Sequence, residues 1–540
     1  MNERTTVLSI HDLSVTFPGS PPAVDGVSFE AEAGKVLSII GESGSGKSTI
    51  LNAIAGLTPP GTIVRGAIDL AGHPENLADP AAERRGVAGS KIAMIFQNPN
   101  ASLNPVLSVS AHLREVIAAH RPRAEASEQI AIDLLARVGL PRDGPHGRDY
   151  LSAYPHQLSG GQRQRVAIAA ALAGAPKVLL ADEPTTALDA TVQAKVLDLL
   201  LTLVDEEQIA LVFVTHDLSI AASIGDHMIV LRQGAVVESG AARVVITNPR
   251  KAYTKALLSA STAFTRGAHR DTRPPLSANR VLTLKGIAKS FSAKGAPRIE
   301  ALAGIDIAVH EGEILGLIGE SGSGKTTLGR IATGLTTADR GEVLLSEKLF
   351  RPAQDRATVQ MVFQDPLASF NPRYSIATAI GHPLRCLKNL SGSARAKRTK
   401  YLLEVMGLDP SLGTRLPHQL SGGQLQRAAI ARALAASPQV LVCDEATASL
   451  DVTVRTQILA LLKNLRESDG LAILFISHDL GVVKTLADNT VVLRQGRIVE
   501  GGRTESILTA PTEAYTRELI QAIPTGTTSW RDAHPARRHP

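Results

Sequence analysis

The sequence contains two copies of one module, and this internal repeat restricts the possible folds more than any other feature. Three motifs of the first half, LSGGQ at 158–162, LLADE at 179–183 and THD at 215–217, return 262 residues later as LSGGQ, LVCDE and SHD. The length difference between the copies lies upstream, between the glycine-rich GESGSGKST (41–49) or GESGSGKTT (319–327) and LSGGQ. A repeat of this kind predicts two homologous domains, each with an insertion-tolerant segment before a block of fixed spacing.

Composition places the domain boundaries. Residues 261–280 are rich in Ser, Thr, Arg and Pro and show no apolar period, so we expect a linker there. The two domains are then 1–260 and 281–524. The last stretch, 525–540, is turn-rich and basic, and is expected to be a mobile tail.

The apolar pattern predicts an α/β fold. A β-branched run at 36–40 leads into the first glycine-rich loop, and residues 48–57 continue at helical spacing. Two further apolar runs, 178–181 and 210–215, are separated by a helical pattern at 191–207. Strands that alternate with helices predict a mainly parallel sheet covered by helices.

Composition also excludes several classes of protein. The apolar fraction is 44% and the charged fraction 20%, as in globular proteins. The sequence contains no run of 18 apolar residues, so it predicts no membrane-spanning helix. The net charge of +6 is too small over 540 residues to indicate nucleic-acid binding. Two cysteines, Cys386 and Cys443, rule out a disulfide framework or a four-cysteine iron–sulfur cluster.

The glycine-rich loops match the strand–GxxxxGK[ST]–helix pattern that binds nucleoside triphosphates. Backbone N–H groups of such a loop surround the phosphates, Lys47 and Lys325 reach the β- and γ-phosphates, and Ser48 and Thr326 ligate Mg²⁺. The candidate phosphate-binding residues are Gly41, Ser43, Gly44, Gly46, Lys47, Ser48 and Thr49, and Gly319, Ser321, Gly322, Gly324, Lys325, Thr326 and Thr327.

Polar side chains that end apolar runs supply the candidate catalytic groups. A carboxylate at a strand end can hold Mg²⁺, and a glutamate beside it can polarise an attacking water. An amide before a proline loop can contact both the Mg²⁺ and the water, and a histidine at a strand end can contact the γ-phosphate. The predicted sets are Asp182, Glu183, Gln97 and His216, and Asp444, Glu445, Gln364 and His478; the expected metal ligands are Ser48, Gln97, Asp182, Thr326, Gln364 and Asp444.

The LSGGQ motifs add a second anion-binding helix start to each copy. One triphosphate needs one phosphate loop, so a second cradle implies a ligand shared between the copies. The residues concerned are Ser159, Gly160, Gly161 and Gln162, and Ser421, Gly422, Gly423 and Gln424. Together with the D-loops at 187–189 and 449–451, this motif set resembles the nucleotide-binding domains of ABC ATPases over nearly the whole chain, twice.

The resemblance implies two ABC-type domains, each a parallel sheet core with a helical subdomain, that hold two ATP molecules head to tail. Each phosphate loop would face the LSGGQ of the other domain, and ATP binding and hydrolysis would close and reopen the pair. Phe17 and Phe291 lie where the family places an aromatic side chain that stacks on adenine.

Further details resemble the peptide/nickel importers of this family. The extended stretches FQNPNASLNP at 96–105 and FQDPLASFNP at 363–372, and the Tyr-Thr pairs at 253–254 and 515–516, are of that type. The resemblance implies a peripheral ATPase on the cytoplasmic face of the inner membrane, bound to two permease subunits that work with an extracytoplasmic solute-binding protein. The expected ligands are ATP and Mg²⁺, without an iron–sulfur cluster or nucleic acid.

Alternatives stay open at this point, because nickel, metallophore, glutathione and sugar importers share these motifs. A soluble tandem ABC protein that acts on ribosomes or DNA is a further alternative, but the linker here is short and contains proline. Two departures stand out within the repeat. Ala446 replaces the Pro184 of the first copy, which should loosen the turn after Glu445, and Ala170 replaces the Arg432 of the second copy.

Overall fold

The structure, a computed structural model of the chain, describes residues 5–79, 82, 86–120, 127–141, 149–186, 188–265, 277–292, 299–447, 450, 452–523 and 530–533. The chain divides into two compact units. The first unit is Met1–Leu188, Val192–Ser261 and Pro524–Pro540, and the second unit is Asp189–Thr191 and Thr262–Ile523. Most of the expected linker lies outside the described residues. Both units contain parallel sheets covered by helices, which confirms the predicted α/β class.

A six-stranded sheet in the order β5-β6-β7-β3-β8-β9 forms the centre of the first unit. Its strands are β3 (Val36–Gly41), β5 (Ile92–Ile95), β6 (Val178–Asp182), β7 (Ala210–Thr215), β8 (His227–Arg232) and β9 (Ala235–Ala241). They run parallel except for β9, which pairs antiparallel with β8. Every residue of β3, β6 and β7 is buried. Burial on both faces explains why these strands read as continuous apolar runs.

A second, antiparallel sheet covers helix α1 (Lys47–Ala55) and was not predicted from the sequence. It has the order β2-β1-β4, with β1 (Thr6–Thr16), β2 (Pro22–Glu32) and β4 (Ile63–Leu70). Ile50 and Leu51 of α1 are fully buried in one apolar core with Ile10 of β1 and Val212 of β7. This core fixes the helix that starts at the first phosphate loop.

Helices complete the first unit. Between β5 and β6 the chain forms α2 (Pro99–Ser102), α3 (Val109–His120), α4 (Ser127–Arg137) and α5 (Gly160–Leu172). The remaining helices are α6 (Ala190–Glu207), α7 (Leu218–Ile224), α8 (Ala242–Thr247) and α9 (Ala252–Thr265). The segment from α2 to α4 corresponds to the insertion-tolerant stretch of the sequence.

The second unit repeats this plan. Its antiparallel sheet contains β10 (Arg280–Phe291), β11 (Ile299–His310), β13 (Arg340–Leu345) and β14 (Lys348–Leu349). Its six-stranded sheet has the order β15 (Val359–Val362), β16 (Val440–Asp444), β17 (Ala472–Ile476), β12 (Ile314–Ile318), β18 (Asn489–Arg494) and β19 (Arg497–Arg503). Strand for strand, this is the order of the first unit.

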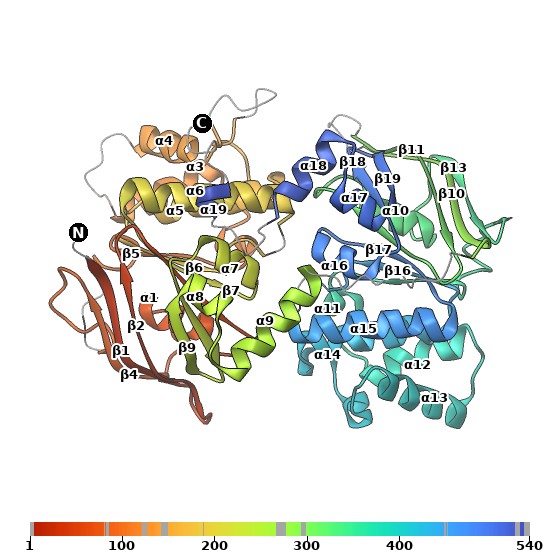
Figure 1. Cartoon of the computed structure of the whole chain (residues 1–540), viewed down its shortest axis with the longest axis horizontal. Helices are drawn as coiled ribbons and strands as arrows, with labels where there is room; N and C mark the ends of the chain where they lie inside the picture. The colour runs from red at the N-terminus through yellow and green to blue at the C-terminus, as the bar shows by residue number, and fades with distance from the viewer. Residues whose placement is uncertain are drawn as a thin grey trace. The chain divides into compact units, whose positions relative to one another are not determined.

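The helices of the second unit also follow those of the first. They are α10 (Lys325–Ala332), α11 (Pro366–Ser369), α12 (Ile376–Cys386), α13 (Gly392–Val405), α14 (Gly422–Leu434), α15 (Val452–Asp469), α16 (Leu480–Leu486), α17 (Thr504–Thr509) and α18 (Ala514–Gln521). Within this unit, β10, β11 and β13 lie at one end and α12 and α13 at the other (Figure 1). Each unit is therefore a sheet core that carries a helical arm. The arm is the segment between Gln97 and Ser159 in the first unit and between Gln364 and Ser421 in the second.

The described part of the expected mobile tail is fixed at two residues. Trp530, the only tryptophan, starts α19 (Trp530–Ala533), is 2% exposed, and donates its Nε1–H to Asp198 Oδ1 at 2.6 Å. The guanidinium of Arg531 pairs with Asp205 at 2.9 Å. A large indole gains free energy by burial, which a prediction from turn-rich, basic composition overlooks.

Among the described residues, no helix is both long enough and apolar enough to cross a lipid bilayer.

Candidate active sites

The predicted site residues gather at one edge of each parallel sheet. In the first unit the glycine-rich loop follows β3, Gln97 follows β5, Asp182 ends β6 with Glu183 after it, and His216 follows β7. Because β3, β5, β6 and β7 are parallel, their carboxyl ends lie at the same edge, which is where open α/β sheets bind ligands. The second unit places its copies of these residues in the same way.

The phosphate loop of the first unit turns tightly around the ammonium group of Lys47. This group lies 2.8 Å from the carbonyl oxygen of Gly41 and 2.8 Å from that of Glu42, and donates to both. Gly46, which precedes α1, has a φ of 99°, a conformation that favours glycine. A Cβ at Gly46 would lie 2.7 Å from the carbonyl oxygen of Ala23, so a side chain is also excluded by space.

The second phosphate loop has the same geometry. The ammonium group of Lys325 donates to the carbonyl oxygens of Gly319 at 2.8 Å and Glu320 at 2.7 Å, and Gly324 has a φ of 107°. Burial lowers the pKa of Lys325, although the nearby carboxylates of Glu445 and Asp444 oppose the shift. Both lysines are buried at the first turn of a helix, where an anionic phosphate would receive the helix N–H groups and the ammonium together.

A hydroxyl and a carboxylate meet beside each lysine. Ser48 Oγ donates to Asp182 Oδ1 at 3.0 Å, and Thr326 Oγ1 donates to Asp444 Oδ1 at 3.1 Å. Burial raises the pKa of both aspartates. Hydroxyl and carboxylate oxygens fit Mg²⁺, which takes one or two carboxylates together with waters and substrate phosphates.

Three donors hold the carboxylate of Glu183. Gln97 Nε2 lies 2.9 Å and Thr186 Oγ1 3.0 Å from Oε2, and His216 Nδ1 lies 3.1 Å from Oε1. Burial alone would raise the pKa of Glu183, but the hydrogen bond and charge of His216, with the Thr186 hydroxyl, lower it to about 2. The group is therefore ionised at neutral pH and can accept a hydrogen bond from water.

Glu445 has the corresponding Gln and His partners in the second unit. Gln364 Nε2 lies 2.5 Å from Oε2, and His478 Nδ1 lies 3.1 Å from Oε1. Burial opposes ionisation of Glu445, but the hydrogen bond from His478 lowers its pKa below the usual range. Burial likewise opposes the charge on His478, and the hydrogen bond to Glu445 raises the pKa of this histidine. The structure thus brings the predicted Gln, Glu and His together in both units.

Both glutamates stand on strained backbone. Their φ angles are 45° and 48°, in the left-handed region that non-glycine residues rarely adopt. The Glu183 N–H donates to the Val214 carbonyl at 3.0 Å, and the Glu445 N–H donates to that of Ile476 at 2.9 Å. Such strain concentrates at functional sites. The φ angle and the backbone hydrogen bond of the glutamate are alike in both units although Ala446 replaces Pro184, and the looser turn stays a prediction.

The signature serines start the long helices α5 and α14. Ser159 accepts a hydrogen bond from the Gln162 N–H at 3.3 Å, while the Ser159 N–H donates to Gln162 Oε1 at 2.9 Å. Ser421 and Gln424 form the same capping box. The structure thus gives both glutamines a contact within the helix start, whereas the sequence assigned them to ligand binding, which stays a prediction.

The two glycines of each signature motif differ in their surroundings. A Cβ at Gly161 would lie 2.2 Å from Val192 Cγ1, and one at Gly423 would lie 2.7 Å from Val454 Cγ1. By contrast, a Cβ at Gly422 would meet nothing within 4 Å, and one at Gly160 only a distant methyl group. The second glycine is therefore required by helix packing, while the first has open space around it at the helix start.

The adenine-stacking role of the two phenylalanines stays a prediction. Phe17 follows β1 and is half-buried, whereas Phe291 ends β10 and is 48% exposed. The ammonium group of Lys289 lies 5.7 Å from the centre of the Phe291 ring. A base that stacked on this ring would take the place of the lysine.

A tyrosine near the end of the second unit contacts the phosphate loop, which sequence reasoning missed. The hydroxyl oxygen of Tyr515 accepts a hydrogen bond from the Glu320 N–H at 3.1 Å, and the Arg494 guanidinium lies 4.6 Å from the ring centre. In the first unit Arg232 lies 4.8 Å from the ring of Tyr253. The repeated Tyr-Thr pair was the available signal, but its long-range partner cannot be read from spacing.

Replacing Tyr515 by Phe should weaken ATP binding at the second phosphate loop several-fold, since one backbone hydrogen bond contributes about 1 kcal/mol. The ring and its contact with Arg494 would stay. Equilibrium titration with ATP measures the effect. The same change at Tyr401, which is 50% exposed on α13, is the matched control and should leave affinity unchanged. Equal affinities for all three proteins would contradict the role of the hydroxyl.

A phosphate loop, an oxygen pair that suits Mg²⁺ and a firmly held, ionised glutamate together define a P-loop ATPase. The ABC transporter family matches residues 24–186 and 302–448, and the family described as "Oligopeptide/dipeptide transporter, C-terminal region" matches residues 237–292 and 499–540. The chain belongs to the ABC transporter family and carries two of its ATP-binding domains in one polypeptide.

Curated relatives match almost the whole chain. The peptidoglycan transport ATP-binding protein YejF of Agrobacterium fabrum is 40% identical over 97% of this chain and 97% of its own length. The glutathione import ATP-binding protein GsiA is 39% identical in Salmonella choleraesuis and 37% identical in Escherichia coli K12, over 99% of this chain and 91% of each relative. A solved dimeric ATP-binding cassette bound to ADP and phosphate is 31% identical over 41% of this chain and 98% of its own, with a TM-score of 0.38.

Proposed function

We propose that this chain is the ATP-hydrolysing motor of an importer for di- and oligopeptides or peptide-derived solutes. The observation that carries the proposal is the double match to the oligopeptide/dipeptide transporter C-terminal region, once at the end of each ATP-binding domain. The relatives named for peptidoglycan transport and for import of glutathione, itself a tripeptide, support the same solute class. Nickel, metallophore and sugar import are the alternatives that the experiment below separates.

Both sites carry a full set of groups for hydrolysis. In each, the phosphate loop and its lysine would bind the triphosphate, and the hydroxyl–aspartate pair, with Gln97 or Gln364, would hold Mg²⁺. Bound there, Mg²⁺ would neutralise charge on the β- and γ-phosphates. Glu183 and Glu445, ionised and fixed by their Gln and His partners, would orient a water for in-line attack on the γ-phosphate.

We further propose that the two units share their ATP molecules. Ser159 and Ser421 are exposed helix caps, and the glycine after each leaves room for an anion. Each would complete the site whose phosphate loop belongs to the other unit, in a head-to-tail sandwich. Hydrolysis would reopen the pair and move two permease subunits through the helical arms between Gln97 and Ser159 and between Gln364 and Ser421.

The proposed partners are two membrane permeases and an extracytoplasmic binding protein, and neither nucleic acid nor an iron–sulfur cluster takes part. The chain would sit on the cytoplasmic face of the inner membrane and reach the bilayer only through its permeases. Expressed alone, it should fractionate largely with soluble protein and move to the membrane fraction when the permeases are co-expressed. Tight membrane association without permeases would contradict this arrangement.

The solute class is tested by reconstituting the chain, its permeases and the binding protein in liposomes, and measuring ATP hydrolysis. A binding protein loaded with di- or oligopeptides, or with glutathione, should stimulate hydrolysis. Stimulation by Ni²⁺, a metallophore or sugars alone would overturn the peptide assignment. A lack of stimulation by every loaded form would overturn transport as the function.

A further inference from the structure

One arginine ties two helices together in the second unit. Arg432, near the end of α14, donates Nη1–H to the carbonyl oxygen of Ser369 at 2.6 Å and Nη2–H to Ser369 Oγ at 3.0 Å. Its guanidinium carbon lies 4.3 Å from the ring centre of Phe370, which is 4% exposed. Two hydrogen bonds and a ring contact hold the end of α11 against α14. We call this contact the Arg432 link.

The Arg432 link joins the loop that contains Gln364 to helix α14, which starts at the signature motif. Helix α11 starts two residues after Gln364, whose amide donates to Glu445, and Asp365 caps that helix through the Ala368 N–H at 3.0 Å. The Ser369 hydroxyl in turn donates to the Pro366 carbonyl at 2.7 Å. Helix α14 starts at Ser421. Gln364 is therefore connected through α11 and Arg432 to the helix that begins with the signature motif.

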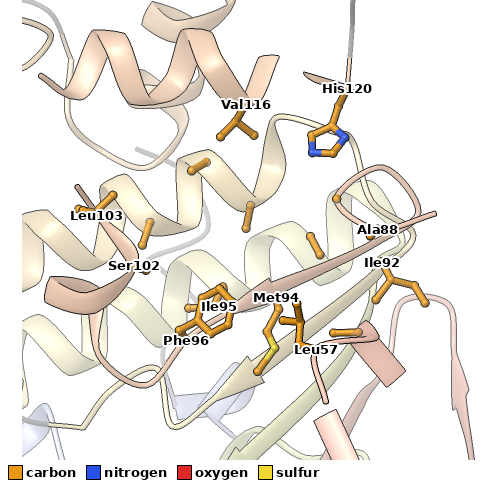
Figure 2. Close-up of a pocket in the computed structure, with 16 residues that line it drawn as sticks. Leu57, Ala88, Ile92, Met94, Ile95, Phe96, Ser102, Leu103, Val116 and His120 are labelled. Atoms are coloured by element: carbon orange, nitrogen blue, oxygen red, sulfur yellow. The ribbon is translucent and has the colours of Figure 1, made fainter. Parts of the chain in front are cut away.

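The first unit lacks this link. Position 170 of α5 is Ala, and Leu103 stands where the second unit has Phe370. A pocket of about 350 Å³ lies there instead, lined mainly by small and apolar side chains, among them Leu103, Ala167 and Ala170. Figure 2 shows Val116 and His120 across the open space from Met94 and Phe96. This pocket, which β5 and α3 also line, lies where the second unit has a hydrogen-bonded contact.

By contrast, another arginine contact of the signature helix occurs in both units. Arg165 of α5 donates to the carbonyl oxygen of Val138 at 3.4 Å, and Arg427 of α14 donates to that of Met406 at 3.4 Å. Each joins its signature helix to the end of the preceding helix of the arm. Gln97 and Gln364 also hold their glutamates alike. The two units therefore share these two contacts and differ at the Arg432 link.

We propose that Arg432 is a positioning residue that couples the glutamine loop of the second unit to its signature helix, and that the first unit, with Ala170 and Leu103, is coupled more weakly. A conformational change at Glu445 would then be transmitted to Ser421 more directly than a change at Glu183 is transmitted to Ser159. The two halves of the motor are thereby mechanically unequal, although their catalytic groups are the same. The proposal rests on the proposed function only where it assigns Ser421 to a shared ATP site.

Hydrogen exchange of the full chain with ATP, in the Glu183→Gln, Glu445→Gln background, tests the coupling without solute or permeases. Amides of 364–370 should exchange roughly tenfold more slowly than those of 97–103, the effect expected for one charge-assisted hydrogen bond. Arg432→Met keeps much of the side-chain volume and should remove the difference, while Arg432→Lys should restore part of it. Arg427→Met, on the same helix, is the matched control and should leave exchange in 364–370 unchanged.

A gain-of-function variant guards against a general folding defect. Ala170→Arg with Leu103→Phe should slow exchange in 97–103 towards the rate of 364–370.

With the glutamates restored, Arg432→Met should lower kcat several-fold and leave KM for ATP unchanged, because the phosphate loops are intact. Equal exchange of the two segments in the parent protein, or no response of 364–370 to Arg432→Met, would overturn the proposal whether or not the transported solute is a peptide.

Discussion

Replacing both Glu183 and Glu445 by Gln is expected to abolish steady-state ATP hydrolysis while leaving ATP binding intact. Each glutamate is held by a Gln and a His at the carboxyl edge of its sheet, ionised and beside the phosphate-loop lysine. Gln keeps the shape of the side chain but loses the charge that orients and polarises the attacking water. Loss of a general base lowers rates by about 10²–10⁴-fold.

Phosphate release and equilibrium ATP binding, measured on the same preparation, separate chemistry from folding. Glu115 and Glu404 are exposed on the helical arms, and the same double change at these two positions is the matched control. The control should hydrolyse ATP at the parent rate. Hydrolysis near that rate in the Glu183→Gln, Glu445→Gln protein would refute the assignment of these two residues as catalytic.

Much of the fold and most of the candidate site could be predicted because their signals are local. The runs at 36–40, 178–181 and 210–215 are apolar on both faces, and the structure makes them the buried strands β3, β6 and β7. The motifs that end these strands meet because parallel strands bring their carboxyl ends to one edge. The positions of these strands in the sequence are therefore enough to predict that Asp182, Glu183 and His216 lie close together.

What escaped prediction depends on contacts between distant segments. The antiparallel sheets pair β1 with β2 and β4 through several register shifts, which an alternating pattern does not report. Tyr515 meets Glu320 across 195 residues, and Trp530 meets Asp198 across 332. The difference between Ala170 and Arg432 is visible in the repeat, but its effect on the helix contact depends on Ser369 and Phe370, which lie more than 60 residues away in the sequence.

The proposed sharing of ATP between the units predicts the second large effect, a difference in ATP binding between two double variants. If one ATP lies between Lys47 and Ser421, these residues form one composite site, and Lys325 and Ser159 form the other. Groups that act as a unit are not additive, so losing both members of one site should cost little more than losing one. Lys47→Ala with Ser421→Ala should spare a whole site, whereas Lys47→Ala with Ser159→Ala should damage both. The two variants remove the same residue types, so each controls for the folding defects of the other.

ATP stoichiometry by equilibrium binding, in the Glu183→Gln, Glu445→Gln background, tests the sandwich most directly. The proposed pairing predicts that the Lys47→Ala, Ser421→Ala protein binds one ATP per chain with parent affinity, and that the Lys47→Ala, Ser159→Ala protein binds poorly at both sites. The reverse result, one intact site in the Lys47→Ala, Ser159→Ala protein and none in the other, would show that each unit binds ATP within itself and would contradict the sandwich.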